Sequence, residues 1–120
     1  MKILIVDDSK AMRMIVRRTL RQAGFAEHDL DEAGNGNEAL EQLHRASFDV
    51  VLSDWNMPVM SGMELLTALK AEKNAVRFGF VTSEGTPAMR KQAADAGAEF
   101  LIAKPFTTDC FVRVLRPVLG

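Results

Sequence analysis

The sequence contains a single cysteine, no long apolar run and almost no net charge. One thiol, Cys110, cannot form an internal disulfide, nor build a zinc site without further cysteine and histidine ligands. No apolar stretch approaches the roughly 18 residues of a membrane-spanning helix, and the apolar start reaches acidic residues too soon for a signal peptide. With 15 Lys plus Arg against 16 Asp plus Glu, the formal charge is −1, and no basic block favours DNA binding. We therefore expect a cytoplasmic protein that binds neither a membrane nor nucleic acid directly.

The amino-acid composition is typical of a single folded domain. The 120 residues are 48% hydrophobic and 26% charged, which provides enough apolar material for a buried core. No repeat, low-complexity stretch or linker divides the chain, so we predict a single domain over residues 1–120. Apolar runs typical of strands alternate with segments whose apolar residues recur at helical spacing. The predicted strands cover residues 2–6, 30–33, 48–53, 76–81 and 100–103.

Turn and capping residues separate these segments. Ser9 is a suitable N-cap for the first helix, and Gly24 follows its C-terminus. Thr86 and Pro87 start the fourth helix, whereas Pro117 is expected to end or kink the last one. Because a helix follows every strand, the strands must pair in parallel, with helices on both faces of the sheet. We predict a doubly wound α/β fold, with five parallel strands in the flavodoxin-like order 2-1-3-4-5 and five helices.

Polar residues stand at the carboxyl ends of the predicted strands. In an open parallel sheet this edge is where ligands bind, near the switch point in the strand order. The first and third strands are neighbours in the predicted order, about 4.8 Å apart, so acidic residues that follow them converge. The residues concerned are Asp7 and Asp8 after the first strand, Asp54 after the third, Thr82 after the fourth and Lys104 after the fifth.

The three acidic residues Asp7, Asp8 and Asp54 then repel one another. Carboxylates about 5 Å apart repel by roughly 3 kcal/mol per pair at an effective dielectric constant near 20. Either a raised pKa, which keeps one carboxyl group neutral, or a bound cation can offset this repulsion. Oxygen ligands without a nearby His or Cys favour a hard divalent ion, and a shallow site with few protein ligands favours Mg²⁺ over Ca²⁺. The sequence therefore predicts a Mg²⁺ site.

Asp54 also has the surroundings of a phosphoryl acceptor. The long side chain of Lys104 can reach across toward Asp54, and Thr82 lies on the strand between them. An anion attached to Asp54 would therefore meet a metal cation, an ammonium group and a hydroxyl donor. Because a carboxylate is ionised at neutral pH, it can attack phosphorus without a general base.

Four segments contain these site residues: Asp7-Asp8, Asp54-Trp55-Asn56-Met57-Pro58, Thr82-Ser83-Glu84 and Lys104-Pro105-Phe106. Together they resemble the receiver domain of bacterial two-component response regulators, and the stretch from Ser53 to Pro58 looks especially like the chemotaxis CheY type. The resemblance covers the whole chain, with the segments in the family's order and spacing. It implies a CheY-like fold and a function in signal transduction.

The resemblance also implies individual roles. Asp54 would accept a phosphoryl group from a histidine kinase, a phosphotransfer protein or a small phosphodonor, and the acyl phosphate would later hydrolyse. Asp8 would bind Mg²⁺ directly, Asp7 largely through water, and Asn56 through its backbone carbonyl. The side chains of Asn56 and Glu84 would flank the approach to the phosphate and could tune its lifetime.

Signal output follows from the same resemblance. Lys104 would pair with the phosphoryl oxygens, and Thr82 would swing toward them, so that phosphorylation changes protein binding. The family usually has Tyr or Phe three residues before the lysine, where this chain has Leu101, and Phe100 faces the other way. We therefore expect a muted or differently built output change. The downstream target is expected on the face of the fourth helix, fifth strand and fifth helix, with Leu101, Phe106 and Val112.

Alternatives to a stand-alone receiver remain. A receiver would be no enzyme in the usual sense, since it catalyses only its own phosphorylation and dephosphorylation. The chain could instead be the N-terminal receiver of a larger response regulator, cut from its output domain, or a receiver that signals without phosphate. An aspartyl-phosphate phosphatase of the haloacid-dehalogenase type would need Asp-x-Asp after one strand, which the chain lacks. A flavin carrier is disfavoured because the first loop, residues 8–11, is acidic and has no glycine.

Other residues have plainer interpretations. Trp55 is expected to be an exposed loop aromatic beside the site. Arg77 interrupts an apolar strand, which suggests a position near the sheet edge or a salt bridge. Four arginines of the first helix are expected on a solvated face, with docking of an acidic kinase surface as the alternative. They are Arg13, Arg17, Arg18 and Arg21.

Overall fold

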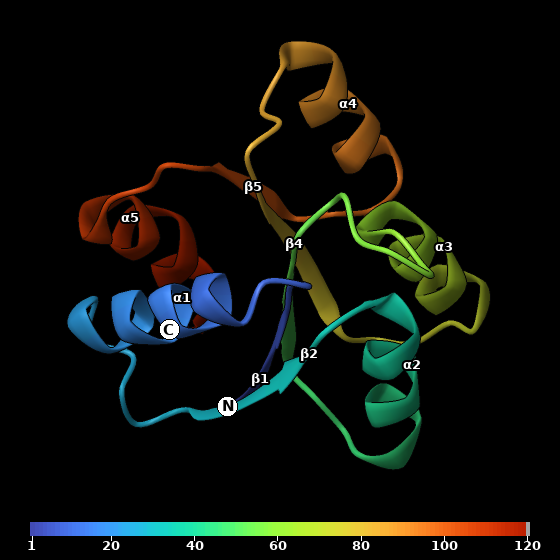
Figure 1. Cartoon of the computed structure of the whole chain (residues 1–120), viewed down its shortest axis with the longest axis horizontal. Coiled ribbons are helices and arrows are strands. Elements are labelled where there is room, and N and C mark those ends of the chain that lie inside the picture. The colour runs from blue at the N-terminus through green and yellow to red at the C-terminus, as the bar shows by residue number, and fades with distance from the viewer. Residues whose placement is uncertain (120) are drawn as a thin grey trace.

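The computed structural model describes residues 1–119, which form a five-stranded sheet between two layers of helices (Figure 1). Neighbouring strands pair in parallel in the order β2-β1-β3-β4-β5, which confirms the predicted doubly wound α/β fold. Every helix within residues 1–119 is too short or too polar to cross a bilayer. The strands are β1 (Lys2–Val6), β2 (Asp29–Ala33), β3 (Val50–Ser53), β4 (Arg77–Thr82) and β5 (Phe100–Ala103). The helices are α1 (Lys10–Gln22), α2 (Gly36–Arg45), α3 (Gly62–Ala71), α4 (Pro87–Asp95) and α5 (Thr108–Leu119).

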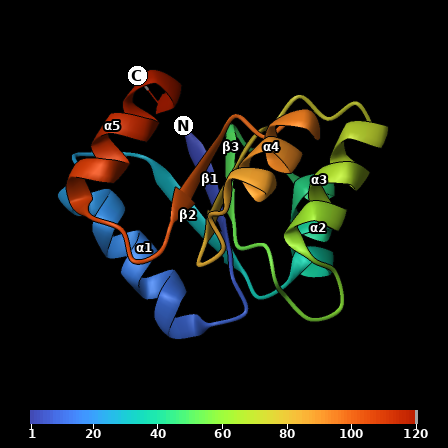
Figure 2. The same cartoon turned by 90° about the horizontal axis from the view of Figure 1, so that it is seen from above.

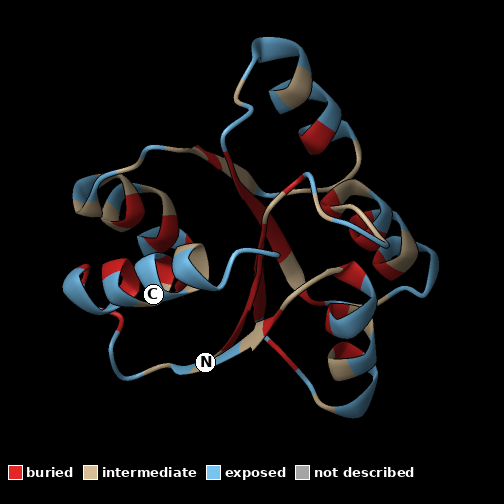
Figure 3. Ribbon diagram, viewed as in Figure 1, coloured by how far each residue is buried: buried red, intermediate tan, exposed pale blue. Residues whose placement is uncertain are grey.

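The helices cover both faces of the sheet. Figures 1 and 2 show α1 and α5 on one face and α2, α3 and α4 on the other. A strand between two such layers is buried on both sides, and all four residues of β3 are buried. Figure 3 shows the burial concentrated on the strands and on the helix surfaces that face them. The carboxyl edge of the sheet, where the predicted site lies, is therefore held by a rigid double-sided core.

Element boundaries differ from the predicted ones by up to two residues. Phe48 is buried but precedes β3, and Thr82 is the last residue of β4 rather than the residue after it. The end of α5 is not at Pro117, because the helix continues to Leu119. A proline in the last turn removes only one backbone N–H, and burial of Val118 and Leu119 holds that turn against the core.

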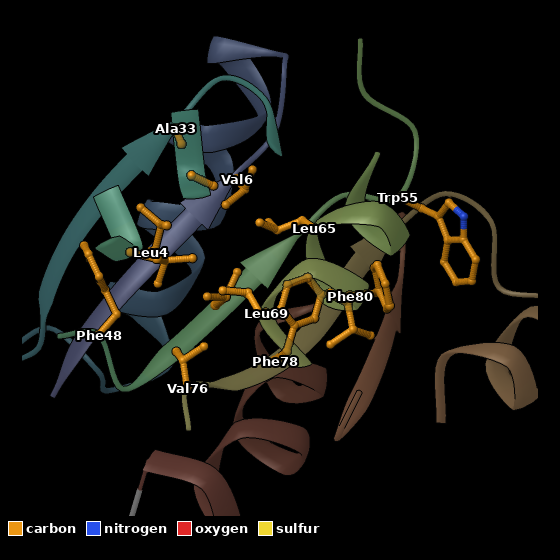
Figure 4. Close-up of a cluster of buried hydrophobic side chains, with 14 of the residues drawn as sticks. Leu4, Val6, Ala33, Phe48, Trp55, Leu65, Leu69, Val76, Phe78 and Phe80 are labelled. Carbon is orange, nitrogen blue, oxygen red and sulfur yellow. The ribbon is translucent and has the colours of Figure 1, made fainter. Parts of the chain in front are cut away.

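Trp55 is buried, so the prediction of an exposed loop aromatic is wrong. Only 8% of its surface is exposed, and its ring stacks on Phe80 with the ring centroids 4.6 Å apart. Figure 4 shows both side chains in the apolar cluster that also contains Leu65 of α3. Gly62 N donates a hydrogen bond to the Trp55 carbonyl oxygen, which folds the loop after β3 back onto the sheet. Packing of Trp55 against the core therefore anchors the loop directly after Asp54.

The interpretation of Arg77 as a salt-bridge residue is confirmed. Its Nε atom lies 2.6 Å from Glu99 Oε2, and its Nη1 atom donates to the Val118 carbonyl oxygen at 3.1 Å. The other interruption of this strand, Gly79, leaves room for Phe100, because a Cβ atom there would lie 2.0 Å from the ring. Both exceptions to the apolar pattern of β4 therefore have a packing reason.

The C-terminus of α3 offers a test of backbone strain. Lys73 has φ +58° just beyond the helix, and the N–H groups of Lys73 and Asn74 donate back to carbonyl groups of the last turn. Gly24 and Gly97 occupy the same place after α1 and α4, with φ +96° and +103°. A side chain in this conformation is unfavourable by about 1 kcal/mol, so Lys73→Gly should raise the free energy of unfolding by roughly that amount. Urea unfolding followed by circular dichroism measures the change.

A matched control reverses this exchange. A Cβ atom at Gly24 would have no atom within 4 Å, so Gly24→Ala tests backbone conformation without a clash. We expect it to lower the free energy of unfolding by about 1 kcal/mol. If wild type and Lys73→Gly have equal urea unfolding midpoints while Gly24→Ala is destabilised, the backbone of Lys73 is not strained.

Candidate functional site

Three carboxylates meet at the carboxyl edge of the sheet. Asp7 and Asp8 follow β1, Asp54 follows β3, and carboxylate oxygens of all three lie within 4.8 Å of one another. The pairing of Val6 with Ser53 brings the two strand ends level, and Asp54 N donates to the Val6 carbonyl oxygen at 2.8 Å. The register of β1 and β3 therefore sets the spacing of the acidic cluster.

Lys104 reaches this cluster from β5. Its Nζ atom lies 3.0 Å from Asp7 Oδ2 and 3.4 Å from Asp54 Oδ2. The lysine is held in place at the strand end, where its backbone N–H donates to the Thr82 carbonyl oxygen at 2.8 Å. The sequence places Lys104 near Asp54, and the structure adds that its shorter contact is with Asp7.

Asp7 is the most enclosed of the three acidic residues, with 4% of its surface exposed. Its Oδ1 atom accepts a hydrogen bond from Ser9 N at 2.9 Å, while Oδ2 faces Lys104. Asp8 is exposed and Asp54 is half-buried. The cluster is therefore fixed at its base by Asp7 and open toward solvent at Asp8.

Asp54 carries a carboxylate in an environment that disfavours its charge. Burial raises the pKa of Asp54, and the charge of Asp7 raises it further. The Lys104 ammonium group and the hydrogen bond from Trp55 N, 2.7 Å from Asp54 Oδ1, act in the opposite direction but do not cancel the rise in pKa. A divalent cation at the cluster would remove this penalty, so the carboxylate set fits such an ion.

The raised pKa predicts how Asp54→Asn changes stability without metal. The folded protein holds the Asp54 proton more tightly than the ordinary pKa of 3.8 implies. Ionisation therefore reduces stability as the pH rises from about that value through the higher folded-state pKa, and the reduction is complete above it. At pH 7 in EDTA, Asp54→Asn should be more stable than wild type, whereas near pH 3 the two should be equal. Thermal unfolding across this pH range measures the difference.

Two outcomes bear on this expectation. Adding MgCl₂ at pH 7 should narrow the stability difference, because the cation stabilises the folded wild type through its carboxylates. A wild type that is more stable than Asp54→Asn at pH 7 in EDTA would show that Lys104 compensates the buried charge in full.

Thr82 lies between the strands that carry Asp54 and Lys104, and it is fully buried. Its Oγ1 atom accepts a hydrogen bond from Glu84 N at 3.2 Å, at the start of the loop before α4. The Asn56 side chain donates to the Glu84 carboxylate, which joins the loops after β3 and β4. These contacts place Asn56 and Glu84 as a bridge between the two loops that follow Asp54 and Thr82.

Two arginines of α1 have a role that the sequence pattern does not reveal. Arg13 and Arg17 both contact Glu32 of β2, and both are only partly exposed, so the expected solvated face is wrong for them. Arg18 and Arg21 are exposed as expected. Spacing of four residues places Arg13 and Arg17 on one helix face, but only the strand order reveals that Glu32 lies opposite.

Comparison with known proteins identifies the family. The family model of the response regulator receiver domain matches residues 3–116. The chain belongs to this family. The chemotaxis protein CheY of Pseudomonas aeruginosa is 42% identical to this receiver over 109 residues, which cover 89% of this chain and 86% of that protein. Chemotaxis protein CheY-3 of Vibrio cholerae is also 42% identical, over 89% of this chain and 82% of that one.

Solved structures agree with this assignment. CheY4 of Vibrio cholerae matches the receiver with a TM-score of 0.84 at 34% identity, over 98% of this chain and 97% of that one. The receiver domain of a Francisella response regulator has a TM-score of 0.86 over 98% and 94% of the chains, and at 23% identity it shows the fold alone. The chain is thus a CheY-type receiver of a two-component response regulator, a family of phosphoacceptor switches whose mechanism is phosphorylation of an aspartate.

Proposed function

We propose that Asp54 is the phosphoryl acceptor of this receiver. The observation that supports this most directly is that Asp54 lies beside two other carboxylates at the carboxyl edge of the sheet, with its Oδ2 atom 3.4 Å from the Lys104 ammonium group. Asp7 and Asp8 are poorer candidates. Asp7 is enclosed and engaged by Ser9 and Lys104, and Asp8 is exposed at the rim of the cluster.

The transfer exchanges one bond to phosphorus for another. An oxygen of the Asp54 carboxylate bonds to phosphorus, the bond between phosphorus and a histidine nitrogen of the donor breaks, and the imidazole leaves with the electron pair. The ionised carboxylate needs no general base. Lys104 is close enough to pair with phosphoryl oxygens attached to Asp54, which lets its ammonium group stabilise their charge. Hydrolysis of the acyl phosphate by water later restores the carboxylate.

The acidic cluster is the proposed Mg²⁺ site, and the family binds this ion at an acidic pocket. Asp7, Asp8 and Asp54 would hold the ion together with the backbone carbonyl of Asn56, in a set made only of oxygen ligands. Bound Mg²⁺ supplies positive charge that offsets the carboxylates and the incoming phosphoryl group.

The output is protein binding. We infer that Thr82 responds to a phosphoryl group on Asp54, and its hydroxyl oxygen accepts a hydrogen bond from Glu84 N in the loop before α4. We infer that the downstream target binds the face of α4, β5 and α5. Leu101, Phe106 and Val112 are partly exposed there, and Leu101 in place of a large ring predicts a muted change. CheY-type receivers work with kinases and downstream targets, so a histidine kinase or phosphotransfer protein in the cytoplasm is the proposed donor.

Intact-mass measurement tests the proposal. The receiver should gain one phosphoryl group when incubated with acetyl phosphate and MgCl₂, and none when EDTA replaces the metal. Phosphorylation that is equally fast in EDTA would contradict the proposed Mg²⁺ dependence.

A further inference from the structure

A half-buried charge network made by Arg13, Arg17 and Glu32 is joined to the acidic cluster through the Asp7 carbonyl group. Arg13 Nε lies 2.9 Å from Glu32 Oε1, and Arg17 Nε lies 3.0 Å from Glu32 Oε2, so each carboxylate oxygen is used by one arginine. Burial raises the pKa of Glu32, but the hydrogen bonds and charges of the two arginines outweigh it and hold this pKa below its ordinary value. Glu32 is therefore an ionised anchor on the edge strand β2.

Each arginine also reaches one backbone carbonyl group. Arg17 Nη2 donates to the Leu30 oxygen at 3.2 Å, which ties α1 to the start of β2. Arg13 Nη1 donates to the Asp7 oxygen at 2.6 Å. Both side chains thus contact Glu32 from one helix face, but Arg13 binds the Asp7 carbonyl group and Arg17 binds that of Leu30.

The carbonyl group of Asp7 belongs to the peptide that leads into Asp8. It lies beyond the end of β1, where the strand ladder supplies no partner for it. The N–H of Asp7 is bound to the Ala33 oxygen at 3.1 Å, so Arg13 completes the fixation of this residue's backbone. Asp8 is exposed, so the direction of its side chain is set mainly by the orientation of the peptide plane between Asp7 and Asp8.

We propose that Arg13, held by Glu32, is a positioning residue for the ion site, which fixes the Asp7–Asp8 turn so that both carboxylates face Asp54. This inference rests on the proposed function. The proposed role and simple electrostatics predict opposite effects of Arg13 on Mg²⁺ affinity, because a positive charge near a cation site would by itself weaken Mg²⁺ binding. Loss of Arg13 should weaken Mg²⁺ binding if the side chain acts through geometry, and strengthen it if the side chain acts through charge.

Mg²⁺ affinity, measured by calorimetry and by the emission of Trp55 beside Asp54, separates these cases. Trp55 is the single tryptophan of the chain, and its backbone N–H donates a hydrogen bond to Asp54 Oδ1. Arg13→Gln should raise the Mg²⁺ dissociation constant at least tenfold, within the roughly 10–100-fold range for residues that orient metal ligands. Arg13→Lys keeps the charge but cannot span both acceptors, so it should show a smaller loss in the same direction.

Arg17→Gln is the matched control. It removes the same kind of contact with Glu32 but none with Asp7, so it should lower thermal stability and leave Mg²⁺ affinity unchanged. If Arg13→Gln does not fold by circular dichroism, Arg13→Lys carries the comparison. Equal Mg²⁺ affinity in the Arg13 and Arg17 variants, or tighter binding in Arg13→Gln, would overturn the inference. A wild type that binds no Mg²⁺ would instead overturn the proposed function itself.

Discussion

Asp54→Asn should abolish the gain of a phosphoryl group from acetyl phosphate and MgCl₂, where wild type gains one. The amide has nearly the shape of the carboxylate and can still accept the hydrogen bond from Trp55 N, which is 2.7 Å long in the structure. What the substitution removes is the anionic oxygen that forms the bond to phosphorus, and a neutral amide oxygen is a far weaker nucleophile. Intact mass spectrometry over a time course measures the result.

Two controls make this result specific. Asp31→Asn changes an exposed carboxylate on β2 that forms an ion pair with Lys2, and it should gain the phosphoryl group at the wild-type rate. The Mg²⁺ affinity of Asp54→Asn should fall without vanishing, because Asp7 and Asp8 remain. A phosphoryl adduct on Asp54→Asn with the wild-type yield would move the acceptor to another residue.

The doubly wound architecture could be predicted because the physics of a parallel sheet leaves few choices, whereas the strand order comes from the flavodoxin-like arrangement. A helix after each strand requires crossovers of one hand, and the short apolar run over residues 50–52 needs cover on both faces. The acidic cluster follows from the same rule. Since Asp7 and Asp54 come directly after neighbouring strands, the sheet brings them together without any information about side-chain packing.

Contacts that depend on packing could not be predicted in this way. Trp55 follows a strand in a polar loop, and nothing in the local sequence shows that the loop folds back and stacks the ring on Phe80. Arg13 and Arg17 look like a solvated helix face until β2 is placed beside α1 with Glu32 opposite. Helix ends near proline are also decided by tertiary burial, as the continuation of α5 past Pro117 shows.

Lys104→Ala should slow phosphorylation by about 10²–10³-fold, the usual effect of removing one charge-stabilising donor from a reacting site. Lys104 Nζ is 3.4 Å from Asp54 Oδ2 and is the cation that the structure places against this carboxylate. In the transfer its ammonium group meets the charge on the phosphoryl oxygens, and water screens that charge only in part, since 13% of the lysine side chain is exposed. The rate of adduct formation at saturating MgCl₂ measures the loss.

Mg²⁺ affinity distinguishes this role from a structural one. The ammonium group and a Mg²⁺ ion are attracted by the same carboxylates. Two unit charges of like sign about 4 Å apart repel by roughly 4 kcal/mol at an effective dielectric constant near 20, and the double charge of Mg²⁺ roughly doubles that repulsion. Lys104→Ala should therefore bind Mg²⁺ more tightly than wild type while it accepts phosphate far more slowly, and Lys104→Arg, which keeps a cation, should stay closer to wild type in both. If Mg²⁺ affinity and phosphorylation rate fall together in Lys104→Ala, the lysine organises the acidic cluster and does not act on the phosphoryl group. Opposite changes in the two quantities are expected only if its charge faces the transferred oxygens, because loss of the folded site would lower both.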